Sequence, residues 1–245
     1  MNLREFCERF HTLLGQRPKP STLLDGGQEL LRELLRNSSW FTEFLRRFVA
    51  HPEFLANQPA SVFDNEIRLY RSPDRSFVIL AYLWDSRNMC PVHDHNAWGV
   101  IGALLHPMRE VKYRRLDDGR AEGFADLERI SNLDFQAGET GIVLPLDKGI
   151  HQTGGTLDRL SISLGVYGRS IRQGLIHFFD PAGKKFFRAP SRILFRKVLA
   201  LKALTCLEET LGEKFLTSSL LQALPPDLVR EFQRIHSGPN PSGVA

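Results

Sequence analysis

Two histidines separated by one residue, His93 and His95, are the feature that most constrains this chain of 245 residues. They lie in residues 90–102, a run of β-branched and aromatic residues that is typical of a strand. Residues i and i+2 of a strand point to the same face, so both imidazoles are expected to project into one space. Two neutral imidazoles on one face can bind one metal ion, although histidine pairs also occur on solvated sheet faces.

A third histidine, His151, strengthens the metal interpretation. It follows an apolar strand-like run at residues 142–146 and a turn at residues 147–149. Strands from two hairpins that are distant in sequence can face each other and place three imidazoles around one ion. The sequence therefore predicts a metal site formed by His93, His95 and His151.

The spacing of these histidines resembles the two motifs of the cupin superfamily and, within it, those of the cysteine dioxygenase-like family of bacterial thiol dioxygenases. The resemblance extends over roughly residues 63–171 and is carried by residues 91–102, 149–151 and 160–168. Most cupins add a glutamate ligand shortly after the histidine pair, whereas residues 96–105 include no acidic residue. The resemblance therefore implies three histidine ligands and no carboxylate ligand.

Strand-like periodicity dominates the middle of the chain. Two runs, 66–72 and 76–85, are joined by a turn at residues 73–75, and further strands are expected at 109–115 and 160–167. The connections are short and rich in turn formers, which indicates a small all-β barrel or sandwich. By resemblance, the fold class is mainly β: a cupin β-barrel, or jelly roll, with N-terminal helices and an extra C-terminal helical region.

Helical periodicity flanks this β-domain on both sides, so the chain is expected to have four parts. Residues 1–62 form a helical region packed on the barrel, and residues 63–185 form the cupin β-barrel with the metal site. Residues 186–236 form a helical extension with a long helix over 190–211, and residues 237–245 form a disordered tail. The extension suits packing or a homo-oligomer, with contact to a membrane or another protein as the alternative.

Composition argues against several classes of function. The chain has 32 Lys and Arg against 28 Asp and Glu, without a recognition-helix or aromatic-stacking motif, so no nucleic-acid partner is expected. The N-terminal residues are charged and amphipathic, unlike a secretory signal, and no apolar stretch is long enough to span a bilayer. The three cysteines lie far apart without a C-x-x-C spacing, which fits a reducing cytoplasm.

The donor set indicates what a bound metal would do. Three neutral imidazoles leave up to three positions open for substrate and dioxygen, which favours iron(II), Fe(2+), over structural zinc closed by four protein ligands. Imidazole also suits zinc, copper and nickel, so iron is implied chiefly by the resemblance. The resemblance implies that a small carboxylate-bearing thiol, cysteine or a larger analogue, is oxidised with O2 to its sulfinate. The alternatives are another metal-dependent cupin, either an isomerase or a dioxygenase of a non-thiol substrate, and a ligand-binding module without turnover.

The resemblance also assigns residues to the substrate. Arg68 matches an arginine that binds the substrate carboxylate, a task suited to the planar guanidinium fork, with Arg71 as a competing candidate. Tyr167 matches a tyrosine whose hydroxyl reaches the substrate and takes part in catalysis. Ser163 matches a serine that hydrogen-bonds behind the pocket.

Two further features concern the walls of the pocket. Gly165 stands where the family has a histidine, and the vacated volume is expected to admit a thiol larger than cysteine. Gly99 stands where vertebrate members have a cysteine that crosslinks to the tyrosine, so no crosslink is expected. Trp84 and Trp98 flank the histidine pair and are expected to form walls of the site.

Overall fold

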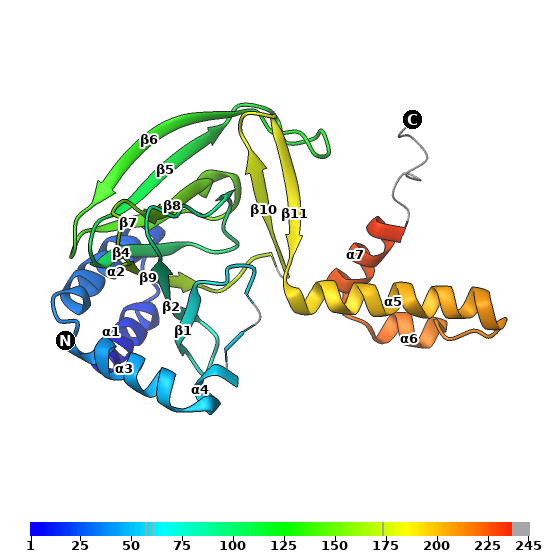
Figure 1. Ribbon diagram of the computed structural model, residues 1–245, viewed down its shortest axis with the longest axis horizontal. Helices are drawn as coiled ribbons and strands as arrows, with labels where there is room; N and C mark the ends of the chain where they lie inside the picture. Colours follow the sequence, from blue (N-terminus) through cyan, green and yellow to red (C-terminus); the bar gives the residue numbers. More distant parts are fainter. Residues whose placement is uncertain (57, 60, 173, 237–245) are drawn as a thin grey trace. The chain divides into compact units, whose positions relative to one another are not determined.

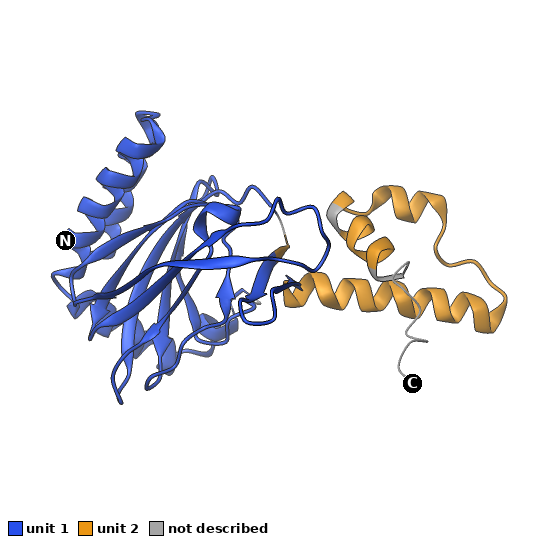
Figure 2. Ribbon diagram, turned by 90° about the horizontal axis from the view of Figure 1, so that it is seen from above, with its two compact units in different colours: residues 1–172, 176–189 blue, residues 173–175, 190–245 orange. Residues whose placement is uncertain are grey.

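A computed structural model describes residues 1–245 except 57, 60, 173 and 237–245. The chain divides into two compact units, one of residues 1–172 and 176–189 and the other of residues 173–175 and 190–245 (Figure 2). The tail that was expected to be disordered, 237–245, lies outside the described residues. Within the described part of the chain, none of the helices has the length and apolar character that a bilayer crossing requires.

The first unit is built on two antiparallel sheets (Figure 1). The strands of the five-stranded sheet are, in spatial order, β1 (Glu66–Arg71), β2 (Phe77–Trp84), β9 (Ser161–Gly168), β4 (Gly99–Leu105) and β7 (Thr140–Val143). Those of the six-stranded sheet are β11 (Lys185–Pro190), β10 (Leu175–Asp180), β3 (Val92–His93), β8 (His151–Gly155), β5 (Met108–Arg115) and β6 (Leu127–Phe135). A short 3-10 helix, η1 (Leu146–Gly149), precedes β8. The expected fold class, mainly β with helices at both ends, is confirmed.

Side chains along β2 and β9 alternate between the two faces of the five-stranded sheet. Ile79 and Ala81 of β2 point to a core shared with helices, whereas Leu80 and Tyr82 point to the other face. The two strands pair in register, with Tyr82 opposite Ser163. Because side chains alternate with a period of two, one face of the sheet packs on helices and the other faces the histidines.

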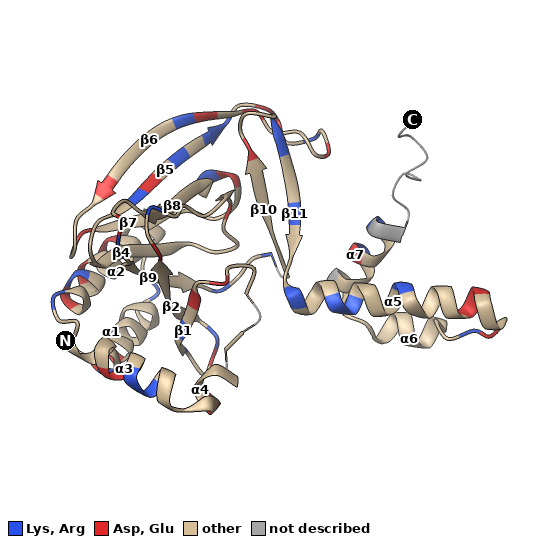
Figure 3. Cartoon of the chain, in the orientation of Figure 1, with Lys and Arg blue, Asp and Glu red and all other residues tan. Residues whose placement is uncertain are grey.

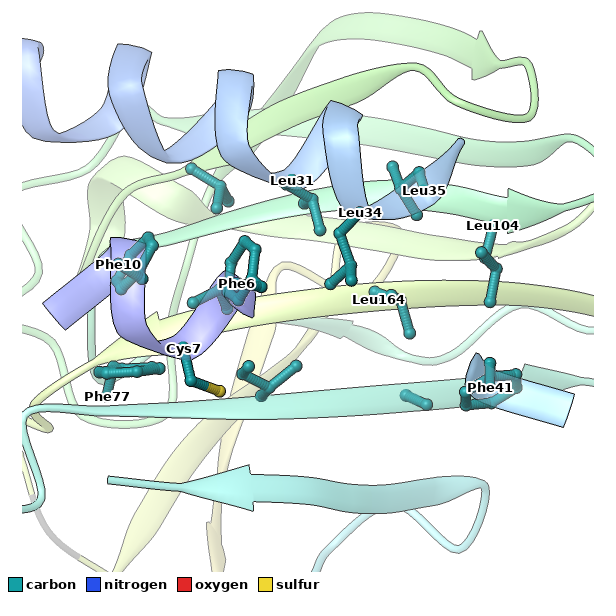
Figure 4. Packing of buried hydrophobic residues seen from close by; sticks show 14 of the residues in the cluster. Phe6, Cys7, Phe10, Leu31, Leu34, Leu35, Phe41, Phe77, Leu104 and Leu164 are labelled. Atoms are coloured by element: carbon teal, nitrogen blue, oxygen red, sulfur yellow. The ribbon is translucent and has the colours of Figure 1, made fainter. Parts of the chain in front are cut away.

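Four helices precede the strands: α1 (Leu3–Gly15), α2 (Pro20–Leu35), α3 (Ser39–Ala50) and α4 (Pro52–Ala56). Figure 4 shows their apolar side chains on the outer face of the five-stranded sheet. Phe6, Phe10 and Leu34 are fully buried there. Helix α2 includes Gly27, where a Cβ would make ordinary van der Waals contact with Phe10 and Val100 at 3.4 Å.

Strand β6 was not expected, and its surroundings explain why. Its residues are mostly exposed, so the apolar alternation that marks a half-buried strand is weak. Basic and acidic residues follow one another along β5 and β6 (Figure 3). Arg109 pairs with Asp134 at 2.6 Å and Arg114 pairs with Glu128 across the two strands. Strand β6 is an edge strand of the six-stranded sheet. Exposed ion pairs of this kind contribute little to its stability.

The second unit consists of α5 (Arg192–Leu211), α6 (Ser218–Ala223) and α7 (Pro226–His236). The Oγ of Ser191 accepts a hydrogen bond from the Leu194 backbone N–H at 3.2 Å, and Gly212 ends α5 with a φ of 72°. A small core of Val198, Leu201 and Phe232 joins α5 to α7. The long helix was expected here, but residues 186–190, assigned to the helical extension, belong to strand β11.

The helix-to-sheet core yields a stability prediction. Leu34 is fully buried, so Leu34→Ala should lower the free energy of unfolding by about 2–5 kcal/mol through lost burial and a residual cavity. The matched control is Leu55→Ala, because Leu55 is 65% exposed; it should change stability by less than about 0.5 kcal/mol. Urea denaturation measures both values, and equal effects would contradict this account of the core.

Candidate metal centre

The structure brings His93, His95 and His151 together, as the sequence predicted. His93 ends the short strand β3 and lies opposite His151 on β8. His95 lies in the loop after β3 rather than on the strand that was expected for it. The three side chains are buried and their candidate ligand atoms lie within 4.8 Å of one another, with 2.7 Å between the Nε2 atoms of His95 and His151.

Hydrogen bonds fix which ring nitrogens of two histidines face the centre. The Nδ1 of His93 lies 2.9 Å from the carbonyl oxygen of Pro91, and the Nδ1 of His151 lies 2.7 Å from Oε1 of Glu110. Both oxygens can only accept from a ring nitrogen, so each Nδ1 is assigned the proton. The Nε2 lone pairs of His93 and His151 are then available to a metal ion.

Electrostatics favours the neutral, metal-binding form of His95 and His151. Burial also opposes the charged form of His93, but Cys90 and the Pro91 carbonyl outweigh it and raise the pKa of His93. Burial, together with the rings of His151 and His93, holds the pKa of His95 well below its ordinary value. Burial likewise holds the pKa of His151 well below its ordinary value, and His93 and Lys112 add to the shift. The described residues that line the cavity beside the three histidines include no carboxylate. Three neutral imidazole donors fit a divalent transition-metal ion and do not by themselves select the element.

A buried carboxylate that the sequence analysis missed, Glu110 on β5, supports one ligand from behind. It is fully buried, and its Oε2 lies 3.2 Å from Nζ of Lys112, which also donates to the carbonyl of Ile142 at 3.0 Å. Glu110 therefore holds His151 as a hydrogen-bond partner rather than joining the ligand set. Its sequence signal was a charged residue two positions after buried Met108, hence on the inward face of a strand.

The imidazoles open into a cavity of about 20 Å³, enough for roughly one water molecule. Cys90 lines this cavity, with its Sγ 3.6 Å from Nδ1 of His93. Trp84 and Ser163 also line it, and Trp84 donates from Nε1 to Oγ of Ser163 at 2.8 Å. Trp98 was expected to form a wall, but it packs instead in the helix-side core near Phe10.

Tyr167 occupies the space that the absence of a histidine at position 165 was expected to leave open. A Cβ on Gly165 would lie 2.4 Å from Cε2 of Tyr167, and a Cβ on Gly99 would lie 2.5 Å from its Cδ1. The ring thus lies in a slot between two glycines and stacks on His95 at 5.3 Å. The expectation of an enlarged pocket is wrong, because the tyrosine itself fills the volume.

Arg68 does not belong to the described lining of the histidine cavity. It lines a neighbouring cavity of about 260 Å³ together with Glu66. The Oε2 of Glu66 accepts a hydrogen bond from the Tyr82 hydroxyl at 3.3 Å, and Tyr82 lines the histidine cavity. Glu66 therefore connects the two cavities, and the carboxylate-binding role of Arg68 stays a prediction.

Asp94, between the two histidines, anchors the loop that carries His95. Its Oδ1 accepts from Nη2 of Arg172 at 2.6 Å and from the backbone N–H of His177 at 2.8 Å. Burial opposes ionisation, but hydrogen bonds from His177 and Arg172 outweigh it and lower the pKa of Asp94 to about 2. Sequence reasoning gave His177 no place near the site, because this contact joins residues 83 positions apart.

No family model matches the chain. Among solved structures, a cupin-like protein from Thermotoga maritima is 9% identical with a TM-score of 0.34, and the match covers 46% of this chain and 74% of that one. A Cupin 2 conserved barrel domain protein from Salinispora arenicola is 18% identical with a TM-score of 0.32, covering 46% and 82%. A structure of DMSP lyases is 13% identical with a TM-score of 0.29, covering 42% and 46%. At such low identities and TM-scores, the likeness carries no argument about activity.

The support of His151 by Glu110 can be tested through metal affinity. Glu110→Gln removes the negative charge behind the imidazole, so affinity for cobalt(II) or iron(II) should fall about 10- to 100-fold. Competition with a chelator measures the affinity, and circular dichroism checks the fold. Glu128→Gln, on exposed β6, is the matched control and should leave affinity unchanged. Unaltered binding in Glu110→Gln would remove Glu110 from this role.

The slot around Tyr167 gives a second prediction. Strand propensity alone would make alanine at position 165 more stable than glycine, whereas the slot predicts a loss of stability. Gly165→Ala should lower the free energy of unfolding by about 1–3 kcal/mol, because the new methyl group overlaps the buried ring. In Gly15→Ala the methyl group meets open space at the end of α1, so stability should be unchanged or slightly higher. A Gly165→Ala protein at least as stable as the parent in urea would show that the ring does not fill this slot.

Proposed function

We propose that this chain is an iron(II)-dependent thiol dioxygenase that oxidises a small carboxylate-bearing thiol, such as cysteine, to its sulfinate. The observation that carries the proposal is a buried set of three imidazoles with no carboxylate among the described residues that line their cavity. The reaction balances as R–SH plus O2 giving R–SO2H, with both oxygen atoms ending on sulfur. His93, His95 and His151 would hold the iron(II), which would supply the open coordination positions for thiol and dioxygen.

The chain's own residues would orient the substrate and hold a proton. The hydroxyls of Tyr167 and Tyr82 are hydrogen-bonded to each other, and burial raises the pKa of Tyr167, so its hydroxyl stays protonated and can donate. Stacking on His95, with 10° between the ring planes, fixes the direction of that hydroxyl. Met108 and Ile101 line the same cavity and make part of its wall apolar.

The substrate carboxylate requires a cation, and this part of the proposal rests on Arg68. The described lining of the histidine cavity has no lysine or arginine, whereas the neighbouring cavity presents Arg68 beside Glu66. A thiol acid is also larger than about 20 Å³, so its binding requires the cavity wall to open. We propose a cytoplasmic protein with small-molecule partners; homo-oligomer formation through α5 to α7 stays a prediction.

The small cavity also favours a second candidate function, a metal-binding cupin module that does not turn over a thiol. In that case the cavity wall around Tyr167 stays closed while the protein functions. A cupin enzyme acting on a non-thiol substrate, by oxidation or isomerisation, is the third alternative. These alternatives differ in oxygen consumption and product, so they can be separated directly.

The deciding experiment combines metal content, oxygen uptake with a panel of thiols, and detection of the sulfinate. The iron-loaded protein should consume one O2 per sulfinate formed, and His151→Ala should lose metal and oxygen uptake together. His51→Ala is the control, because its side chain is 53% exposed and lies outside the site. Metal retention without thiol-dependent uptake would favour the binding module. Full iron occupancy in His151→Ala would refute the three-histidine site itself.

A further inference from the structure

Four arginines line the neighbouring cavity of about 260 Å³, which is open to solvent and which we call the arginine cavity. It is lined by Arg68 and Arg71 of β1, Arg75 of the β1–β2 turn and Arg169 just after β9. Sequence reasoning treated Arg68 and Arg71 as competitors for one task. The structure places both in the same cavity, so the question becomes what such a concentration of charge can hold.

An irregularity in β1 puts Arg68 and Arg71 on one face. Residues three apart on a regular strand point to opposite faces, but the β1–β2 register shifts between Arg68 and Tyr70. Arg68 therefore pairs with Leu80 and Arg71 with Val78. Leu80 and Val78 share the inward face of β2, so both arginines lie over the same face of the sheet.

The turn that follows adds the other two arginines. Arg75 has a φ of 59°, a left-handed conformation that residues other than glycine adopt rarely. Its backbone N–H donates to the carbonyl of Ser72 at 2.9 Å, which closes the turn. Arg169 donates from Nη2 to the backbone carbonyl of Asp74 at 3.1 Å, tying the end of β9 to this turn.

The acidic groups around the arginine cavity do not balance its charge. Glu66 is the one carboxyl group among the described lining residues, against four guanidinium groups. Burial raises the pKa of Glu66, whereas the hydrogen bonds from Ser61 and Tyr82 and the charge of Arg68 partly offset this shift, so Glu66 compensates at most one of the four guanidinium charges. The carboxylate of Asp74 accepts from the backbone N–H and the hydroxyl of Ser76 at 3.1 and 2.8 Å, so it is engaged within the turn.

We propose that the arginine cavity binds a small anion with two or more negative charges, a phosphate compound or a polycarboxylate. Guanidinium forks bind phosphate and carboxylate oxygens bidentately, and several charges on one ligand offset the mutual repulsion of the four arginines. A thiol with a single carboxylate would bind one guanidinium group and would not compensate the charge of the others. The inference concerns anion binding alone and does not depend on the proposed oxidation.

Calorimetric titration of the full chain with pyrophosphate, at constant ionic strength, tests the proposal. Binding should be saturable with one site per chain, weaken as salt is raised, and exceed acetate binding by at least an order of magnitude. Arg71→Gln combined with Arg75→Gln should weaken it about tenfold or more. Citrate, run in parallel, distinguishes a polycarboxylate from a phosphate ligand by which of the two binds more tightly.

Controls separate this site from general charge and from the histidines. Arg120→Gln removes an arginine whose side chain is 89% exposed on another loop and should leave binding unchanged. His151→Ala should also bind pyrophosphate normally, which excludes chelation by a metal at the histidine site. Thermal unfolding without ligand checks that the double variant is folded. Absence of saturable binding, equal binding of acetate, or an equal loss in Arg120→Gln would overturn the proposal.

Discussion

The pairing of β3 with β8 is the contact on which the site depends. It places His93 opposite His151, and the loop after β3 then turns His95 toward the same point. Burial lowers the pKa of His95 and His151, because it disfavours the charged imidazolium, and so keeps their nitrogen lone pairs free. A structure without this pairing would leave three unrelated histidines.

Buried charge around the three imidazoles has an organising role. Glu110 and Asp94 are both fully buried, and each is held by a cation, Lys112 or Arg172. Buried ion pairs often give little net stability, since desolvation offsets their attraction. Here the pairs fix geometry instead: Glu110 orients the His151 ring, and Asp94 ties the loop between His93 and His95 to strand β10.

Local patterns were sufficient for much of the fold. Period-two alternation marked β1, β2, β5 and β9, and helical spacing marked the helices before and after the sheets, because each of these elements has one apolar face. The exposed strand β6 and the strands β10 and β11 lacked that signal. The boundary near residue 190 was placed too early because β11, like β6, has few buried residues.

The metal-binding histidines could be predicted from the sequence, but the hydrogen bonds and packing around them could not. The three histidines could be grouped from spacing and resemblance, whereas Glu110 and His177 act through hydrogen bonds to residues 41 and 83 positions away. The missing side chain at Gly165 indicated free volume, yet the ring two residues on fills it. The shift in β1 register joined Arg68 and Arg71, which a regular strand would have separated.

X-ray absorption spectroscopy of the metal-loaded full chain tests the central claim most directly. The account predicts three imidazole nitrogens at about 2.0–2.2 Å, with the remaining positions held by exchangeable light atoms. A sulfur ligand near 2.3 Å would contradict it, since that would place the Cys90 thiolate on the metal. Fewer than three imidazole ligands would contradict it equally.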